Sequence, residues 1–136
     1  MRKLNQGLTL IELMVAVAII GILAGIAYPS YVGFVNQSNR AEPQRELMRI
    51  ANLQEMFFVD NREYTSDMKD LGLGADPFIT ESGNYSIDAT VNAGKDTFVL
   101  KATALGQQAT NDAACLNMQI TETGVKSATS TDCWEK

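Results

Sequence analysis

Most of the residue types that carry out enzyme chemistry are missing or scattered in this chain of 136 residues. It contains no histidine, which removes the commonest general base and the commonest metal ligand. It also has no glycine-rich phosphate loop, no serine in a nucleophile elbow and no cluster with metal-ligand spacing. The sequence therefore predicts a protein that is not an enzyme and that carries neither a cofactor nor a metal.

Three acids in one loop come nearest to a metal site. Asp67, Asp70 and Asp76 could suggest calcium, but they lack the spacing of an EF-hand and its terminal glutamate. We interpret them as solvated loop acids.

Glu12 is the single charge in an apolar stretch that runs from Gly7 to Ala27. A helix of about twenty apolar residues is long enough to cross the roughly 30 Å hydrocarbon core of a bilayer. A charged side chain at the centre of such a helix costs about 2.5–3.5 kcal/mol on insertion scales, and less near the interface. The position of Glu12 therefore predicts either a partner for the carboxylate or a function that needs it.

The residues before this stretch are few, polar and basic, with Arg2 and Lys3. A secretory signal peptide is cleaved after its apolar region, whereas the natural break here lies before it. Glycine suits a cleavage site because a residue without Cβ lets its backbone lie close to a protease. Cleavage after Gly7 would make Leu8 the N-terminus, place Glu12 one helical turn away and change the net charge from −5 to −7, since two basic residues are lost.

The segment GLTLIEL, from Gly7 to Leu13, resembles the class III signal of type IV prepilins and of type II secretion pseudopilins. The resemblance implies that a prepilin peptidase cuts between Gly7 and Leu8 and N-methylates Leu8. It also implies that Glu12 neutralises the N-terminal amine of a neighbouring subunit and so sets the register of a filament. The family usually has phenylalanine where this chain has Leu8, a departure that bears on methylation. The alternative is an uncleaved membrane anchor in which Glu12 is incidental.

The two cysteines, Cys115 and Cys133, both lie near the C-terminus. The positive-inside rule places the basic leader in the cytoplasm and the rest of the chain in the periplasm or outside, where disulfides persist. A bridge between these cysteines would contribute about 3 kcal/mol in the chain-entropy model. Two free thiols remain the alternative. The pair Cys133-Trp134 near the end of the chain resembles PilE-type minor pilins, in which a terminal disulfide closes the last region.

The first helix is predicted to run from Leu8 to about Val59, with weak points at Pro29 and Pro43. Its membrane-spanning or filament-core part is assigned to residues 8–28, after the leader 1–7, and its periplasmic half to residues 29–59. One largely apolar face recurs at three- and four-residue spacing in the second half. It comprises Leu47, Ile50, Ala51, Gln54, Phe57 and Phe58. Two ion pairs, Glu42–Arg45 and Glu46–Arg49, are predicted on the solvated side.

Residues 60–136 are predicted to form a globular head. A long loop with one helical turn at Met68–Leu71 comes first, tethered by Tyr64, Leu71, Leu73 and Phe78. Alternating patterns then predict strands over Tyr85–Val91, Thr97–Ala104, Cys115–Thr121 and, more briefly, Val125–Ala128, with a polar loop at Gly106–Ala114. The fold class is α+β: an antiparallel meander of three or four strands, covered on one face by the second half of the helix.

The combined features favour a structural subunit of a type IV pilus, and a minor subunit over the major one. A type II secretion pseudopilin is the first alternative, and a DNA-uptake or adhesive pilin is the second. The expected partners are other pilin subunits, the prepilin peptidase, the inner-membrane assembly machinery and the membrane itself. No nucleic acid is expected, because an acidic chain is poorly suited to displace counterions from phosphates.

Overall fold

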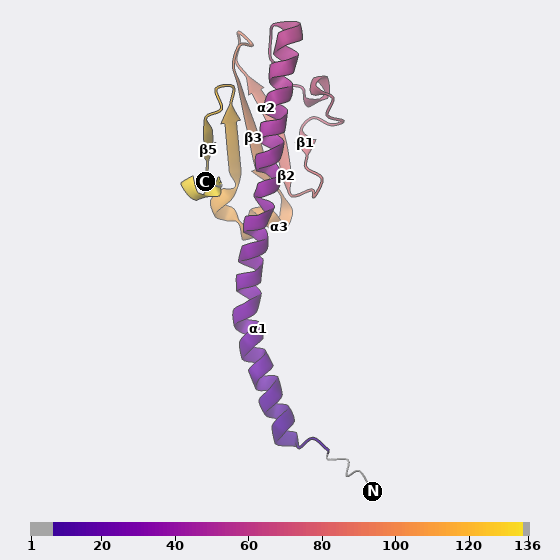
Figure 1. Ribbon diagram of the computed structural model, residues 1–136, viewed down its shortest axis with the longest axis vertical. Coiled ribbons are helices and arrows are strands. Elements are labelled where there is room, and N and C mark those ends of the chain that lie inside the picture. Colours follow the sequence, from indigo (N-terminus) through magenta and orange to yellow (C-terminus); the bar gives the residue numbers. More distant parts are fainter. Residues whose placement is uncertain (1–6, 135–136) are drawn as a thin grey trace. The chain divides into compact units, whose positions relative to one another are not determined.

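The structure is a computed structural model that describes residues 7–134 (Figure 1). The predicted leader, apart from Gly7, lies outside the described residues. The chain divides into two compact units, one ending at Phe34 and the other beginning at Val35, and we describe each by itself.

The first unit is the N-terminal part of helix α1, which spans Leu10–Asn39. Apolar residues lie on all sides of this helix, and its most apolar window of 18 residues has a mean hydropathy of 2.6. By length and composition the helix is sufficient to cross a membrane. Pro29 lies inside α1, so this predicted weak point does not end the helix.

A break at Arg40 separates α1 from helix α2, Ala41–Asn61, so the prediction of one unbroken helix is wrong at this residue. Pro43 explains the break, because it has no N–H to offer the Asn39 carbonyl and its ring clashes with that carbonyl. The backbone instead forms a tighter turn with a 3₁₀-type hydrogen bond, in which the Arg40 N–H donates to the Gln37 carbonyl at 3.2 Å. Helix α2 ends two residues later than predicted, at a left-handed Arg62 whose N–H donates to the Phe58 carbonyl.

The second unit contains one antiparallel sheet in the order β1-β2-β3-β4-β5. Its strands are β1 Phe78–Ile79, β2 Tyr85–Val91, β3 Phe98–Ala104, β4 Asn117–Thr121 and β5 Lys126–Ala128. Helix α2 crosses one face of this sheet and contacts β2, β3 and β4 (Figure 1). The predicted α+β class is confirmed, with five strands in place of three or four.

Two segments differ from their predicted structure. Strand β1 lies in the predicted long loop, which otherwise contains the expected turn η1, Met68–Leu71. The predicted polar loop after β3 holds a short helix α3, Gly106–Asn111, and the start of a 3₁₀ turn η2, Ala113–Cys115. Since that turn includes Cys115, β4 begins at Asn117 and not at the cysteine.

The core lies between α2 and the covered face of the sheet. Leu47 and Ile50 of α2 are fully buried, and the strand register sets Leu100 between Ala89 and Ile120 on the same face. The predicted tethers Tyr64, Leu71 and Leu73 are buried, whereas Phe78, Phe57 and Phe58 are partly buried against this core.

One of the two predicted ion pairs forms. Arg49 lies 2.6 Å from Glu46, as predicted. Glu42, which was predicted to pair with Arg45, accepts hydrogen bonds from the N–H and the hydroxyl of Ser82 instead. Glu42 therefore fastens the β1–β2 connection to α2.

Candidate functional site

The described surface of the first unit, residues 7–34, is almost wholly apolar and exposed. Its large exposed side chains include Leu8, Leu10, Ile11, Leu13, Met14, Val15, Val17, Ile19, Ile20, Ile22, Leu23, Ile26, Tyr28, Tyr31 and Phe34. A contiguous apolar surface of this extent marks a site that lipid or protein must cover. Glu12 is the only charged residue between Gly7 and Asn39.

The Glu12 carboxylate is held by Thr9, the residue before the first turn of α1. Glu12 Oε2 accepts from the Thr9 N–H at 2.8 Å and from the Thr9 hydroxyl at 2.7 Å, while the Glu12 N–H donates to Thr9 Oγ1 at 3.3 Å. This reciprocal arrangement is a capping box. It satisfies part of the carboxylate's hydrogen-bonding capacity and turns it toward the N-terminal end of the helix. The role of Thr9 was not predicted, although the spacing Thr-x-x-Glu is a recognisable signal of a capping box.

Gly7 and Leu8 are both open to solvent. Leu8 is 82% exposed, and a Cβ added at Gly7 would meet no atom within 4 Å. The described chain would therefore accept a larger residue at Gly7 without a clash. Any requirement for glycine there must come from an enzyme that acts on the chain.

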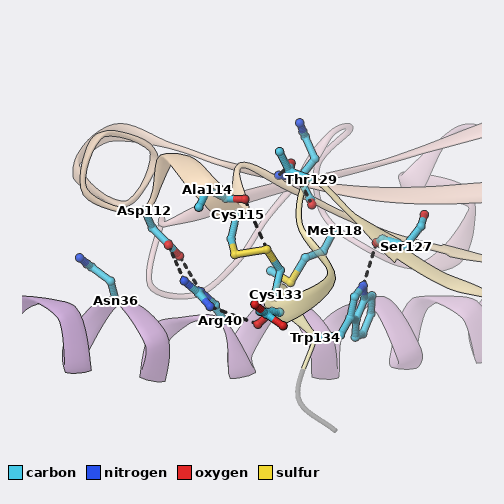
Figure 2. Close-up of a disulfide and its surroundings, with 12 residues drawn as sticks. Asn36, Arg40, Asp112, Ala114, Cys115, Met118, Ser127, Thr129, Cys133 and Trp134 are labelled. Carbon is cyan, nitrogen blue, oxygen red and sulfur yellow. Dashed lines mark hydrogen bonds and ion pairs between the residues drawn. A yellow bond between two sulfur atoms is a disulfide. The ribbon is translucent and has the colours of Figure 1, made fainter.

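The predicted disulfide is present, and it joins Cys115 of η2 to Cys133 of the 3₁₀ turn η3, Thr131–Cys133 (Figure 2). Both cysteines are buried in the core. The Cys133 carbonyl accepts from the Gln44 side-chain amide of α2 at 2.9 Å. The bridge and this hydrogen bond together fix the C-terminal segment to α2. Trp134 follows and donates its indole N–H to the Ser127 carbonyl at 2.8 Å.

An ion pair lies beside the disulfide at the α1–α2 break (Figure 2). Arg40 donates to both carboxylate oxygens of Asp112, from Nε at 2.7 Å and from Nη2 at 2.6 Å, and Asp112 is buried. These hydrogen bonds to Asp112 raise the pKa of Arg40 above its usual value. The Arg40 guanidinium also donates to the Asp132 carbonyl at 3.4 Å, so it links both ends of the disulfide-closed segment.

Gln108 completes the contacts at this break. Its amide N–H group donates to the Asn36 carbonyl at 3.1 Å, and its carbonyl oxygen accepts from Asn39 at 3.0 Å. Because the Arg40 N–H is turned to Gln37, the Asn36 carbonyl lacks its usual backbone donor, and Gln108 supplies one. The roles of Gln108 and Asp112 could not be predicted, since nothing in their spacing connects them to residues about seventy positions earlier.

The three loop acids considered as calcium ligands make contacts with the protein instead. Asp67 accepts from the Lys69 N–H at the start of η1, Asp70 accepts from the Thr65 hydroxyl, and Asp76 accepts from the Met68 N–H. Among residues 7–134 no group of three or more histidine, cysteine or acidic residues could hold a metal ion.

The similarity to known proteins extends along most of the chain. Residues 2–28 match the prokaryotic N-terminal methylation motif, and residues 29–119 match the family described as type IV minor pilin ComP, DNA uptake sequence receptor. The chain belongs to the type IV pilins. Pilins are structural proteins, so family membership confirms that this one is not an enzyme.

Relatives of this pilin include major subunits. It is 38% identical over 91 residues to the type IV major pilin protein PilA of Myxococcus xanthus, an alignment that covers 66% of this chain and 39% of the relative. It is 32% identical over 111 residues to a fimbrial protein of Pseudomonas aeruginosa, with 77% and 71% of the two chains covered. The chain spans 39–65% of the length of the first curated relatives it matches.

A solved structure shows the same fold. A type IV pilin from Shewanella oneidensis aligns with a TM-score of 0.56 and 26% sequence identity, covering 74% of this chain and 99% of that one.

Proposed function

We propose that this pilin is made as a prepilin, cleaved between Gly7 and Leu8 by a prepilin peptidase and N-methylated at Leu8. Residues 8–28 then hold the subunit in the inner membrane, with the head in the periplasm, until the assembly machinery moves it into a filament. The exposed apolar surface of residues 10–28 of α1, interrupted only by Glu12, is the observation that carries this proposal. Such a surface suits lipid before assembly and the helices of other pilin subunits afterwards.

Glu12 gives the assembly its register. An unpaired carboxylate is costly in a medium of low dielectric constant, so the favoured stagger is the one that brings a neighbour's α-amine beside it. Thr9 satisfies part of the hydrogen-bonding capacity of the Glu12 carboxylate while the subunit is alone in the membrane. The new amine at Leu8 lies next to Thr9 in sequence, so the groups that must meet between subunits are all at one end of the helix.

We propose a minor subunit of a type IV pilus. The match of residues 29–119 to a minor-pilin family and the Cys133-Trp134 pair support this assignment, although several relatives are named major pilins. A pseudopilin of type II secretion would share the leader and α1, and it remains the alternative. Electron microscopy with an antibody to the head distinguishes a minor pilin, a major pilin and a pseudopilin. Sparse label along pili indicates a minor subunit, and dense label indicates a major one. Label that is seen only under secretion conditions indicates a pseudopilin.

The family's description as a DNA uptake sequence receptor favours DNA binding as a second candidate function. The charges of the head weigh against general affinity for phosphate: Arg40, Arg49 and Lys95 each form an ion pair with a carboxylate. A gel shift of labelled DNA duplexes by the full chain in detergent, repeated at rising salt, tests it. We expect no shift of unrelated DNA, and a shift limited to particular sequences would establish the second function.

The direct test of the main proposal is mass spectrometry of sheared pili. The expected N-terminal peptide begins at Leu8 and is one methyl group heavier than its sequence. A chain that stays in the membrane fraction and still begins at Met1 would contradict the proposal.

A further inference from the structure

A groove of about 280 Å³ lies on the surface of the second unit, between α2 and the turn that joins β4 to β5. Met48 and Ala51 contribute apolar atoms to its lining from α2. Phe98 and Ile120, which belong to the buried core, line it from the sheet. The groove therefore brings core side chains within reach of the surface.

Two carboxylates lie at the groove, Glu55 on α2 and Glu122 in the turn after β4. Glu55 accepts a hydrogen bond from the Tyr64 hydroxyl at 3.0 Å. Glu122 is half-buried, and nothing within residues 7–134 forms a hydrogen bond or an ion pair with its carboxylate. No basic residue of the described chain lines the groove. The negative charge at the groove therefore has no cation to balance it within this part of the subunit.

Exposed apolar side chains lie beside the groove. Met48 is exposed at its lining, and Val125 is exposed next to the groove residue Gly124. The same face of α2 continues to Met56 and Val59, which are 65% and 69% exposed. A small cation bound in the groove would leave these side chains in water. The surface therefore fits a protein partner, since methionine is enriched at the interfaces between proteins.

An arginine side chain matches this combination of charge and apolar surface. Its aliphatic stem packs along apolar atoms while its charged end reaches the rim. The planar guanidinium has five N–H donors, so it can bond two carboxylates at once. A lysine ammonium supplies the same charge with a less directional set of hydrogen bonds. The groove therefore fits a basic side chain, and arginine fits it best.

A second copy of this chain is a poor source of that side chain. From Val35 onward the sequence contains 15 acidic and 9 basic residues, so two heads carry net charge of the same sign and repel each other. Three of the cations, Arg40, Arg49 and Lys95, are already paired with carboxylates of the head. A subunit that is sparse in the filament also meets mostly chains of another sequence. The partner that agrees with these points is a different pilin.

We propose that the groove receives an arginine or lysine side chain of a different pilin subunit, with its charged end between Glu55 and Glu122. The inference rests on the proposed function, because a minor subunit has neighbours of another kind in the filament. It adds a charged contact between heads to the apolar contact between helices. The same partner covers the exposed side chains of Met56 and Val59.

Photo-cross-linking in assembled pili tests the partner. Asn52, which lines the groove, is replaced by the photoreactive residue benzoylphenylalanine in the full-length chain. Pili are irradiated and sheared, and cross-linked peptides are identified by mass spectrometry. We expect a peptide of another pilin that contains arginine or lysine.

The matched control carries benzoylphenylalanine in place of Asp88, an exposed residue on the opposite face of the sheet, and should not yield that peptide. Three results from pili that contain the Asn52 variant would overturn the inference. They are a cross-link to a second copy of this chain, a cross-linked peptide without a basic residue, and no cross-link to a pilin.

Neutralising the groove provides an independent measurement. We expect the double variant Glu55→Gln/Glu122→Gln to lower recovery of the subunit in sheared pili about tenfold, because the partner's cation is then buried without a counter-charge. Glu81→Gln, which neutralises an exposed acid between β1 and β2, is the control and should be recovered normally. A non-reducing gel of membrane fractions checks that Cys115–Cys133 still forms in each variant. Normal recovery of the double variant overturns the inference alone, whereas absence of the unaltered chain from pili overturns the proposed function and the inference together.

Discussion

Thr9 and Glu12 show how one acid can be tolerated at the start of an apolar helix. The Thr9 N–H and hydroxyl both donate to the carboxylate, which thereby remains near the end of the helix where backbone N–H groups give a partial positive charge. Glu12 is therefore not unpartnered in the single chain, and in the proposed assembly a neighbour's amine would have to compete with Thr9 for it.

We expect Glu12→Ala to leave processing largely intact and to lower recovery of the subunit in pili by about tenfold or more, equivalent to ~1.4 kcal/mol per contact. The loss follows because no carboxylate then favours one stagger over others. Immunoblots of sheared pili and of membranes measure both effects. Thr9→Ser, which keeps the hydroxyl, is the control, and normal incorporation of Glu12→Ala would contradict the assigned role.

Gly7→Phe should leave the leader attached. The residue has open space around it in this chain, so a failure to process would reflect exclusion from the peptidase and not misfolding of the substrate. Intact mass spectrometry of the membrane fraction measures the retained leader. Gly7→Ala, with the smallest added side chain, should be processed more completely than Gly7→Phe, and equal shortening of both would refute the prediction.

The buried ion pair at the α1–α2 break should matter more than the exposed one on α2. Asp112→Asn leaves Arg40 without its counter-charge in a largely buried place, and we expect a loss of about 3 kcal/mol in the free energy of unfolding. Glu46→Gln removes an exposed pair and should cost no more than about 0.5 kcal/mol. Urea unfolding of both variants makes the comparison, and equal losses would rule out the distinction.

At the scale of elements, the predictions succeeded where side-chain periodicity was strong. Strand β2 was predicted to the residue because Tyr85–Val91 alternates strictly. A helix over most of α2 was predicted because Leu47, Ile50 and Gln54 repeat at helical spacing, although its start and its end were not. Strand β1 was missed because two residues are too few to show alternation. The short helix α3 was missed because it consists mainly of polar residues and so has no apolar face that would show helical spacing.

The break at Arg40 shows what local sequence could not supply. Pro43 was identified as a weak point, but so was Pro29, and only one of them interrupts the helix. Gln108 donates to the carbonyl freed at the break, and Asp112 binds the adjacent Arg40. These contacts depend on tertiary structure. Likewise, the Cys115–Cys133 pairing could be predicted from the compartment, but the Cys133–Gln44 contact could not.

These contacts predict where the head can be separated from α1. A chain that begins at Val35 keeps Asn36 and Arg40, and we expect it to fold without detergent as a monomer with the disulfide formed. A chain that begins at Ala41 loses both contacts and should unfold at a lower urea concentration. Size-exclusion chromatography and urea titration measure the two. Equal stability of both chains would mean that the last residues of α1 contribute nothing to the head.

For the molecule as a whole, two buried tyrosines predict how stability depends on alkaline pH. Burial is the main reason that the pKa values of Tyr64 and Tyr85 are raised to about 12. A raised pKa means that the folded head holds these protons more firmly than the unfolded chain, so stability is complete below about pH 10 and falls as the pH rises from 10 toward 12. Urea midpoints for the chain that begins at Val35 should decline over this range. The decline should be smaller in Tyr85→Phe, and an identical decline would exclude Tyr85 as a contributor.

The absence of a polar side on α1 limits the assemblies in which this pilin can leave the lipid. Two such rods laid together would shield only the strip where they touch and leave the remainder in water. A bundle in which each rod is surrounded by other rods shields every side. We therefore expect α1 to be covered by lipid in the lone subunit and by several neighbouring helices in the assembly.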